Sequence, residues 1–567
     1  MQNYWDKVTK ERLNRRRLLQ AGGALSVGVG ALALIGCGSS DSDGGNGGGG
    51  SSEAYTGQRT PSTGEAKPGG NYGSYFATIG SYNTVAFYHD GYNNTGITVY
   101  DRPITARLGT DEGYVLEAME SIEVGDPLRV VLKLKPGMVF QNKAPVNGRA
   151  VTAADIVATQ EYVKTLPNAE NSQFQRTFVD RWEAPDANTV IIHLSKPSAY
   201  LLSSTYLANP TAQPIIPKEL LSSLDTTLPI GSGPFELADH TFGTRYSYKK
   251  FENYREAKTG KPYFATREIF ALTDAVAQES SFRSEQIHEW LPAASAFGRL
   301  NSELDATKFG SVNYLSPGLI TINGMTNVQL GGARPWNDIR VREAFYRVTN
   351  KAQWISLAYD SRGEVPTGIV AAALPSYQLS ASETEKFFKQ DVAAAKQLLS
   401  AANYDSSKEW EIVVSNTNAS NATAAEVWQQ QLSQIGVKVR ITAMPNAQIL
   451  PQKMAPGQFD FWVGQQPGGD TPARAMRNLH SNTNDQFSNV GLYDTALDAM
   501  IEKSEVTTDR EENIKLVKQI QFDALNKYTT SINAVTQQLA FFYNKKVANL
   551  IVDPLTGQDY QYDAWFV

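Results

Sequence analysis

Short apolar stretches alternate with helical repeats along most of the chain, and turn residues separate them. Arg129–Leu134 and Thr189–Leu194 are short runs rich in β-branched residues and predict strands, as does Val437–Ile441. The apolar spacing predicts helices over Thr152–Val163, Asp338–Lys351, Asp391–Ala402, Ala424–Ile435, Asp494–Lys503 and Arg510–Leu525. Helices and strands alternate without a fixed repeat, which predicts mixed α/β layers with largely βαβ connections.

The first 37 residues follow a different pattern. A basic group that contains Arg15 and Arg16 precedes the apolar, glycine-rich segment Ala21–Gly36, and Cys37 follows it. This order is typical of an export signal. The apolar segment has 16 residues, fewer than the roughly 20 that span a bilayer. The paired arginines resemble a twin-arginine signal, although the general export route also accepts an arginine cluster.

Cys37 is the only cysteine among 567 residues, so it can form no internal disulfide. The four residues that end at Cys37, Leu-Ile-Gly-Cys, resemble a lipobox, in which the cysteine is lipidated and becomes the new N-terminus. We therefore expect residues 1–36 to be a signal peptide. Residues 37–68 are rich in glycine and serine and predict a flexible, lipidated tether that holds the protein extracytoplasmically on the cell membrane.

Charge and length narrow the possible functions. The whole chain carries a net charge of −6, and removal of residues 1–36 leaves 46 basic and 56 acidic residues, a net charge of −10. Such an acidic surface repels phosphate backbones, which disfavours nucleic acid as a partner. About 500 residues exceed what one hydrophobic core organises, so two or three domains are expected. No apolar run after the signal is long enough to span a membrane.

The folded part contains motifs in a characteristic order, and they lie at Leu134–Phe140, Val151–Ile156, Ile230–Phe235, Pro335–Phe345, Asp391–Leu399 and Trp428–Val437, with Asn323 before the fourth. Together they resemble extracytoplasmic solute-binding proteins of the dipeptide/oligopeptide/nickel-binding family, which serve ABC importers. The resemblance covers roughly residues 69–567, but residues 264–316 and 355–385 match poorly.

The resemblance implies an α/β, two-lobed periplasmic-binding-protein-like fold with an extra domain in the N-terminal half. A hinge of two crossing strands would join the lobes, and a ligand would be enclosed between them without catalysis. The implied boundaries place lobe I at 69–97, 212–315 and 531–567, the extra domain at 98–211, and lobe II at 316–530. The expected partners are a small solute such as a peptide, an ABC permease complex, and the membrane through the lipid anchor, with the protein itself a monomer.

One segment carries much of the recognition in peptide-binding members of that family. It has the form Gly-Trp-x-x-Asp, and its aspartate pairs with the α-ammonium of a peptide. In this chain Trp462 falls on the tryptophan, Val463 follows it, and Gln465 falls on the aspartate. A neutral amide cannot neutralise a buried ammonium, whereas it suits a hydroxyl or another neutral polar group. Asp470, five residues further on, is the alternative partner for an ammonium.

Other candidates for the ligand site follow from position alone. Ser81 and Tyr82 lie in the loop after the first predicted strand, and Asn446 lies after the strand that ends near Ala443. Of the tryptophans, Trp462 is expected in the cleft and Trp428 in the core.

Several motif residues have structural interpretations. Gly137 and Gly233 would supply turn geometry. Asp155 and Asp338 would start helices, and Arg340 and Arg342 would pair with acids near the surface of a lobe.

Three alternatives remain beside oligopeptide binding. An oligosaccharide or another neutral polar solute would suit Gln465, and a sensory lipoprotein could use the same fold. An enzyme is disfavoured, because Ser232 lies between glycines but not in a Gly-x-Ser-x-Gly motif, and the five histidines lack metal-ligand spacing. No metal or cofactor is expected, and a nickel or haem ligand is disfavoured because there is no histidine cluster.

Overall fold

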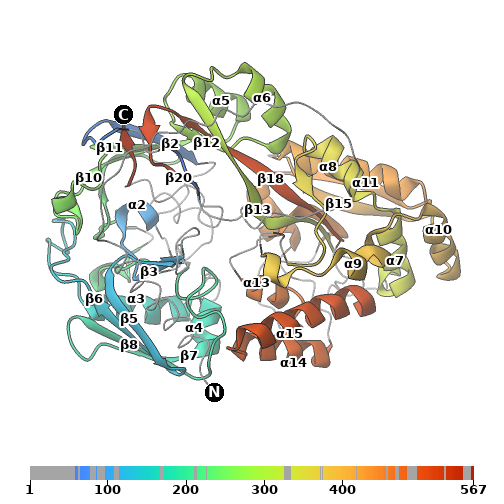
Figure 1. Cartoon of the computed structure of the whole chain (residues 1–567), viewed down its shortest axis with the longest axis horizontal. Helices are drawn as coiled ribbons and strands as arrows, with labels where there is room; N and C mark the ends of the chain where they lie inside the picture. Colours follow the sequence, from blue (N-terminus) through green and yellow to red (C-terminus); the bar gives the residue numbers. More distant parts are fainter. Residues whose placement is uncertain are drawn as a thin grey trace, which may run out of the picture.

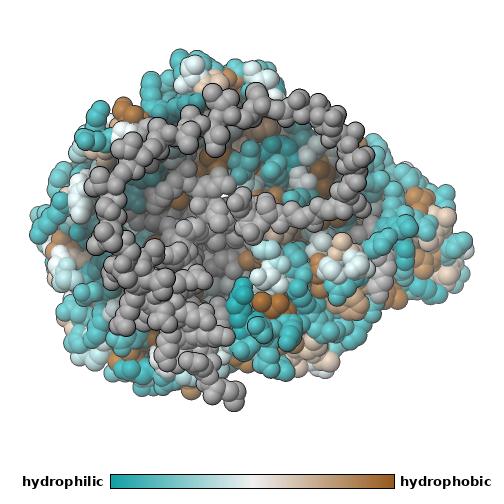
Figure 2. Space-filling model, viewed as in Figure 1, coloured by the Kyte–Doolittle hydropathy of each residue, from teal (hydrophilic) through white to brown (hydrophobic). Residues whose placement is uncertain are grey.

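The computed structural model describes residues 58–61, 64–76, 83, 85, 96–106, 114–166, 172–209, 213–224, 226–324, 334–370, 372, 374–416, 418–454, 458–466, 471–481, 494–528, 532–552 and 563–567. This part of the chain folds into two lobes, with an additional domain beside the first (Figure 1). Within it, no helix combines the length and the apolar character needed to cross a bilayer. The coloured part of the surface in Figure 2 is largely hydrophilic, with scattered apolar side chains.

Lobe I contains a four-stranded sheet in the order β2-β11-β10-β9. Strands β2 and β11 are parallel, and the other pairs are antiparallel. The short helix α2 is fully buried beside this sheet. The bounds are β2 (Asn71–Phe76), α2 (Ile97–Val99), β9 (Phe235–Thr241), β10 (Arg245–Lys250) and β11 (Thr266–Ala271).

The additional domain contains an antiparallel sheet in the order β5-β6-β8-β7, beside helices α3 and α4. Its apolar side chains belong to the same core cluster as those of the lobe I sheet, for example Phe140 and Tyr72. The bounds are β3 (Ile104–Ala106), β4 (Tyr114–Leu116), β5 (Met119–Asp126), β6 (Arg129–Leu134), α3 (Ala153–Thr165), α4 (Ser172–Phe178), β7 (Val179–Glu183) and β8 (Thr189–Leu194).

Lobe II is built on the seven-stranded sheet β12-β18-β13-β17-β15-β16, in which β14 also pairs with β18. One face packs against helices α7, α8, α10 and α11 in a separate core. The strand bounds are β12 (Glu289–Trp290), β13 (Phe309–Asn323), β14 (Gly363–Glu364), β15 (Glu409–Ser415), β16 (Lys438–Met444), β17 (Phe461–Gln466) and β18 (Ile532–Asn544). The helix bounds are α7 (Ile339–Val348), α8 (Lys351–Ala358), α9 (Ala381–Phe388), α10 (Val392–Ala401) and α11 (Ala419–Ser433).

The long strands β13 and β18 run antiparallel from one lobe into the other (Figure 1). Their pairing begins at Phe309 opposite Asn544 and ends at Ile322 opposite Ile532, with a register shift between Leu315 and Leu319. Helices α5 and α6 lie at the lobe I end of these strands (Figure 1). Their bounds are α5 (Ala275–Arg283) and α6 (Phe297–Glu303).

Helices α13, α14 and α15 form a third group, which has its own small core. In Figure 1, α14 and α15 lie on the side of the molecule away from β13 and β18, next to α4 and β7 of the additional domain, and α13 lies between them and β13. Among the described residues, the two halves therefore meet at these helices as well as along the long strands. The remaining bounds are α12 (Asn446–Ile449), α13 (Ala473–Arg477), α14 (Thr495–Val506), α15 (Arg510–Asp523), β1 (Gln58–Arg59), β19 (Val547–Ala548), β20 (Ile551–Val552) and β21 (Trp565–Phe566).

Most elements expected from the sequence are present, but two expectations were wrong. The helix expected at 338–351 is divided into α7 and α8, because the Asn350 side chain accepts a hydrogen bond from the Gln353 amide and starts a second helix. The connections between strands are also not largely βαβ. All strand pairs in the main sheet of the additional domain are antiparallel, whereas β15, α11 and β16 form a βαβ unit in lobe II.

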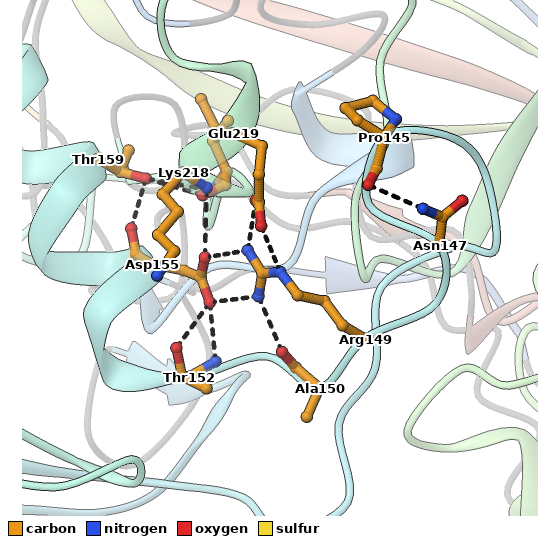
Figure 3. Close-up of polar contacts among 10 residues, drawn as sticks. Pro145, Asn147, Arg149, Ala150, Thr152, Asp155, Thr159, Lys218 and Glu219 are labelled. Carbon is orange, nitrogen blue, oxygen red and sulfur yellow. Dashed lines mark hydrogen bonds and ion pairs between the residues drawn. The ribbon is translucent and has the colours of Figure 1, made fainter.

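The start of α3 confirms the role expected for Asp155. This fully buried carboxylate accepts hydrogen bonds from the Thr152 amide (3.0 Å) and the Lys218 amide (3.2 Å). The Arg149 guanidinium contacts Asp155 at 2.6 Å and Glu219 at 2.6 Å, as Figure 3 shows. Its hydrogen bond lowers the pKa of Glu219. Arg149 thereby ties the first turn of α3 to the turn at Lys218–Leu220.

Gly231 and Gly233 allow α2 to approach the chain closely. A Cβ at Gly231 would lie 2.1 Å from the Val99 carbonyl oxygen, and one at Gly233 would lie 2.7 Å from the same oxygen. Neither glycine has a positive φ, so glycine is needed at these positions because the backbone at Val99 lies too close for a side chain. Gly137, in contrast, adopts a φ of +74° in a turn.

Gly231→Ala should lower the free energy of unfolding by at least about 1–3 kcal/mol, because the added methyl group overpacks a backbone contact. Urea unfolding followed by circular dichroism measures the change. Gly125→Ala is the control, since nothing lies within 4 Å of that Cβ. Equal unfolding midpoints for the two variants would contradict the expectation.

Candidate ligand-binding site

The carboxyl ends of three parallel strands meet at one edge of the lobe II sheet. β15 pairs in parallel with both β16 and β17. On β17, Trp462 lies opposite Asn323 and Gln466 lies opposite Leu319 of β13. Because β13 enters this sheet from lobe I, the carboxyl end of β17 is directed towards lobe I. Ligands of open α/β sheets bind outside the carboxyl ends of the strands, so this edge is the candidate site.

Gln465 lies at this edge, opposite Ile320. Its side chain is exposed, and its Nε2 donates a hydrogen bond to Ser316 Oγ at 2.9 Å. Ser316 is fully buried, and its Oγ also accepts from the Gly318 amide at 3.2 Å. Within the described ranges, the amide oxygen of Gln465 makes no hydrogen bond and is available as an acceptor.

Trp462 and Val463 lie on opposite faces of β17. The Val463 side chain is fully buried in the core of lobe II, which leaves only its backbone for a ligand. The Trp462 indole is 7% exposed and packs with a small group of apolar residues, Val413, Ile449, Met454 and Phe459. It lies across Gly464, where a Cβ would be 2.1 Å from the ring. Contact of Trp462 with ligand stays a prediction.

Two further polar residues occupy the same edge. Asn446 is exposed and begins α12, directly after β16. Ser415 ends β15, is 6% exposed, and pairs in register with Met444 of β16. The sequence did not indicate Ser415 or Ser316. Ser316 falls in a stretch without a recognisable motif, and no local pattern marks either serine.

The long strand β18 contributes buried polar groups near the edge. Thr536 lies opposite Leu319, the residue that also faces Gln466 from the other side. Its hydroxyl is buried and makes no hydrogen bond in the part of the chain that the structure describes, and the same is true of Asn533 Oδ1. Since buried polar groups are normally satisfied, these two atoms are candidates for hydrogen bonds to ligand or water.

Some of the other candidate residues have structural roles, and the rest lie outside the part of the chain that the structure describes. Asp338 accepts from the Arg340 amide and starts α7, and the Arg340 guanidinium pairs with it at 2.6 Å, as expected. Arg342 instead donates to the Trp336 carbonyl at 2.6 Å. Trp428 is fully buried, which confirms its place in the core. Ser81, Tyr82, Asp470, Cys37, Arg15 and Arg16 lie outside the described residues.

The side chains identified at this edge are neutral and polar. They offer an amide, hydroxyl groups and an aromatic ring, which suit hydrogen bonding and stacking. Among the described residues, no group of three histidine, cysteine, aspartate or glutamate side chains could hold a metal ion.

Residues 114–487 match the sequence profile of the bacterial extracellular solute-binding proteins, family 5. The chain belongs to this family. Among curated relatives of this family 5 protein is the glutathione-binding protein GsiB of Salmonella typhimurium. It is 24% identical over 479 residues, which cover 82% of this chain and 86% of the relative.

Solved structures share the two-lobed fold. The oligopeptide-binding protein AppA from Bacillus subtilis, in complex with a nonapeptide, superposes with a TM-score of 0.75 at 18% identity, covering 89% of this chain and 100% of AppA. NikA from Staphylococcus aureus, in complex with Ni(L-His)2, gives 0.72 at 15% identity, covering 88% and 100%. At these identities the likeness establishes the fold alone. It confirms the expected periplasmic-binding-protein-like architecture.

Proposed function

We propose that this protein is the substrate-binding component of an ABC importer and captures an oligopeptide or a similar small solute between its lobes. The observation that carries the proposal is the lobe II edge, which is directed towards lobe I and at which Gln465, Ser415 and Asn446 all lie. Family membership supports it, because relatives named for glutathione and for peptides share the family or the fold.

Binding in this proposal needs closure but no covalent chemistry. A ligand that touches both lobes stabilises the closed form by its differential affinity for that form. Lobe I and the additional domain share one core cluster, whereas lobe II has its own. We therefore propose that 69–97, 212–315 and 531–567 together with 98–211 move as one body against 316–530.

The Gln465 side chain favours neutral polar ligands over ligands with a free α-ammonium group. An amide offers a hydrogen-bond acceptor but no charge to an α-ammonium. An oligosaccharide or another neutral polar solute is therefore the second candidate. A sensory lipoprotein on the same fold is the third, and neighbouring genes for a permease and an ATPase would favour transport over sensing.

Attachment and export form a separate part of the proposal. The arginine pair at Arg15 and Arg16 supports a twin-arginine signal, and the motif that ends at Cys37 supports a lipid anchor. Together they describe an extracytoplasmic protein tethered to the cell membrane through residues 37–68.

Native mass spectrometry of the purified protein is the most direct test. We expect a bound solute from the cell, whose mass identifies its class. Small-angle scattering should then show a smaller radius of gyration once that solute is added back to stripped protein. An unchanged radius at saturating solute, or release of chemically altered solute, would count against a binding protein of this kind.

Gln465→Asp should shift ligand preference towards free amines. A charge-assisted hydrogen bond contributes about 1.5–3 kcal/mol, which is roughly a tenfold to hundredfold change in affinity. Calorimetry with a tripeptide and its N-acetylated form measures the preference. Wild type should bind the acetylated form at least as well, and the variant should prefer the free amine.

The matched control is Gln434→Asp, which adds the same carboxylate on the exposed C-cap of α11. If wild type strongly prefers the free amine and Asp470→Asn abolishes that preference, Asp470 is the anchor. The interpretation of Gln465 would then be wrong, while peptide binding would stand.

A further inference from the structure

The additional domain contacts lobe II directly, far from the hinge strands. Residues 199–206 of that domain meet Thr471, Arg477, Glu505 and Asn513 of the α13–α15 group. We call this contact the clasp. Figure 1 places α14 and α15, which carry Glu505 and Asn513, on the side opposite β13 and β18.

The polar centre of the clasp is buried. The Tyr206 hydroxyl donates to Glu505 Oε1 at 3.2 Å and accepts from Arg477 Nη2, while Arg477 Nε donates to Glu505 at 2.8 Å. The Arg477 guanidinium also lies over the Tyr206 ring, 4.9 Å from its centroid. Tyr206 is fully buried and Glu505 is 6% exposed. Burial raises the pKa of Tyr206, so its hydroxyl stays protonated and able to donate.

Three further bonds extend the clasp along the boundary. The Ala199 amide donates to the Glu505 carbonyl at 2.7 Å, and the Tyr200 hydroxyl donates to Asn513 Oδ1 at 3.0 Å. The hydroxyls of Thr205 and Thr471 lie 2.9 Å apart. Ala473 of α13 belongs to the core cluster of lobe I and the additional domain, so apolar packing crosses the boundary as well.

We infer that the clasp sets the ratio of closed to open protein and thereby the affinity for every ligand, without touching the ligand. When the hinge opens, the groups that lie farthest from it move apart the most. The bonds at the clasp therefore exist only in the closed form. Apparent affinity is proportional to the fraction of protein that is competent to bind tightly. Weakening the clasp should therefore reduce all affinities by one common factor. This inference rests on the proposed binding function.

The test uses the double variant Tyr200→Phe/Tyr206→Phe, which keeps both rings and leaves Glu505 paired with Arg477. Loss of two hydroxyl bonds should lower the closed-to-open ratio roughly 5- to 100-fold. Two ligand-free readouts report this change. Hydrogen exchange at the Ala199 amide should accelerate, and small-angle scattering should give a larger radius of gyration. Tyr359→Phe is the control, because that buried hydroxyl bonds to Asn421 at 3.0 Å within lobe II.

A stronger variant, Ala473→Arg, inserts a bulky charged side chain at a residue that is 1% exposed and belongs to the core cluster of lobe I and the additional domain. It should open the protein fully, with an enlarged radius of gyration and retained helical circular dichroism. With a tripeptide and its N-acetylated form as probes, the double tyrosine variant should lose affinity for both by the same factor.

An unchanged radius of gyration and unchanged Ala199 exchange in the double tyrosine variant would overturn the inference, and so would a loss of affinity for only one probe. A lower melting temperature without opening would make the clasp a purely structural contact and would also overturn it. Because the first two readouts need no ligand, they can succeed even if wild type binds neither probe. That result would contradict the proposed ligand class and leave the clasp intact.

Discussion

Arg102→Met is expected to lower the free energy of unfolding by about 3–5 kcal/mol. Arg102 and Glu117 form a bidentate pair, with Nε to Oε2 and Nη2 to Oε1 both at 2.9 Å. Their side chains are 3% and 2% exposed. Removing the guanidinium leaves a carboxylate buried without its countercharge, and desolvation of that charge is the main cost. Urea unfolding followed by tryptophan fluorescence measures the loss.

Two further variants separate this cause from a general effect of the substitution. Arg102→Met/Glu117→Met removes both charges and should recover much of the stability, because no uncompensated carboxylate remains. Arg181→Met is the matched surface control, since Arg181 pairs with Asp180 where both side chains are 58% exposed, and it should change stability by less than about 1 kcal/mol. Equal losses for Arg102→Met and the double variant would show that desolvation of Glu117 is not the cause.

The Arg102–Glu117 pair matters for function because of where it lies. The chain leaves lobe I for the additional domain just after α2, and it returns near Ile215, whose amide donates to the Asp101 carbonyl at 2.8 Å. Asp101 also pairs with Arg255 at 3.0 Å, yet burial raises the pKa of this carboxyl group. Buried polar contacts thus hold both chain segments that connect lobe I with the additional domain. These buried contacts support the proposed joint movement of lobe I and the additional domain.

Local sequence patterns predicted individual elements well. The strands at Arg129–Leu134 and Thr189–Leu194 are present with those limits. The helix at Ala153 begins where expected, and its start is a capping box in which Thr152 and Asp155 bond reciprocally. These features depend on residues close together in the chain, so a single sequence contains the information. Motif order also predicted the two-lobed fold, because each motif marks one element of a known arrangement.

Contacts between distant segments were not predictable in the same way. Gln465 and Ser316 are 149 residues apart, and Tyr206 and Glu505 are 299 apart. Neither pair has a local signature, since a serine or a tyrosine becomes a site residue only through the fold that brings its partner near. The largely antiparallel sheets were missed for the same reason. Strand pairing is decided by packing across the whole domain, whereas apolar periodicity reports only the local element.

Cys37→Ala should move the protein from the membrane fraction to the soluble extracytoplasmic fraction. We propose that Cys37, the sole cysteine, carries the lipid that holds the chain, and no later apolar run in the sequence is long enough to replace it. Each buried methylene contributes about 0.8 kcal/mol to membrane binding, so several acyl chains retain a protein firmly whereas a single chain does so only marginally. Fractionation with an alkaline wash, followed by immunoblotting, measures the distribution. Ser39→Ala, two residues further on, should leave the protein on the membrane. If the Cys37→Ala protein resists the alkaline wash as wild type does, lipidation at Cys37 is not the anchor, and the apolar segment Ala21–Gly36 becomes the alternative.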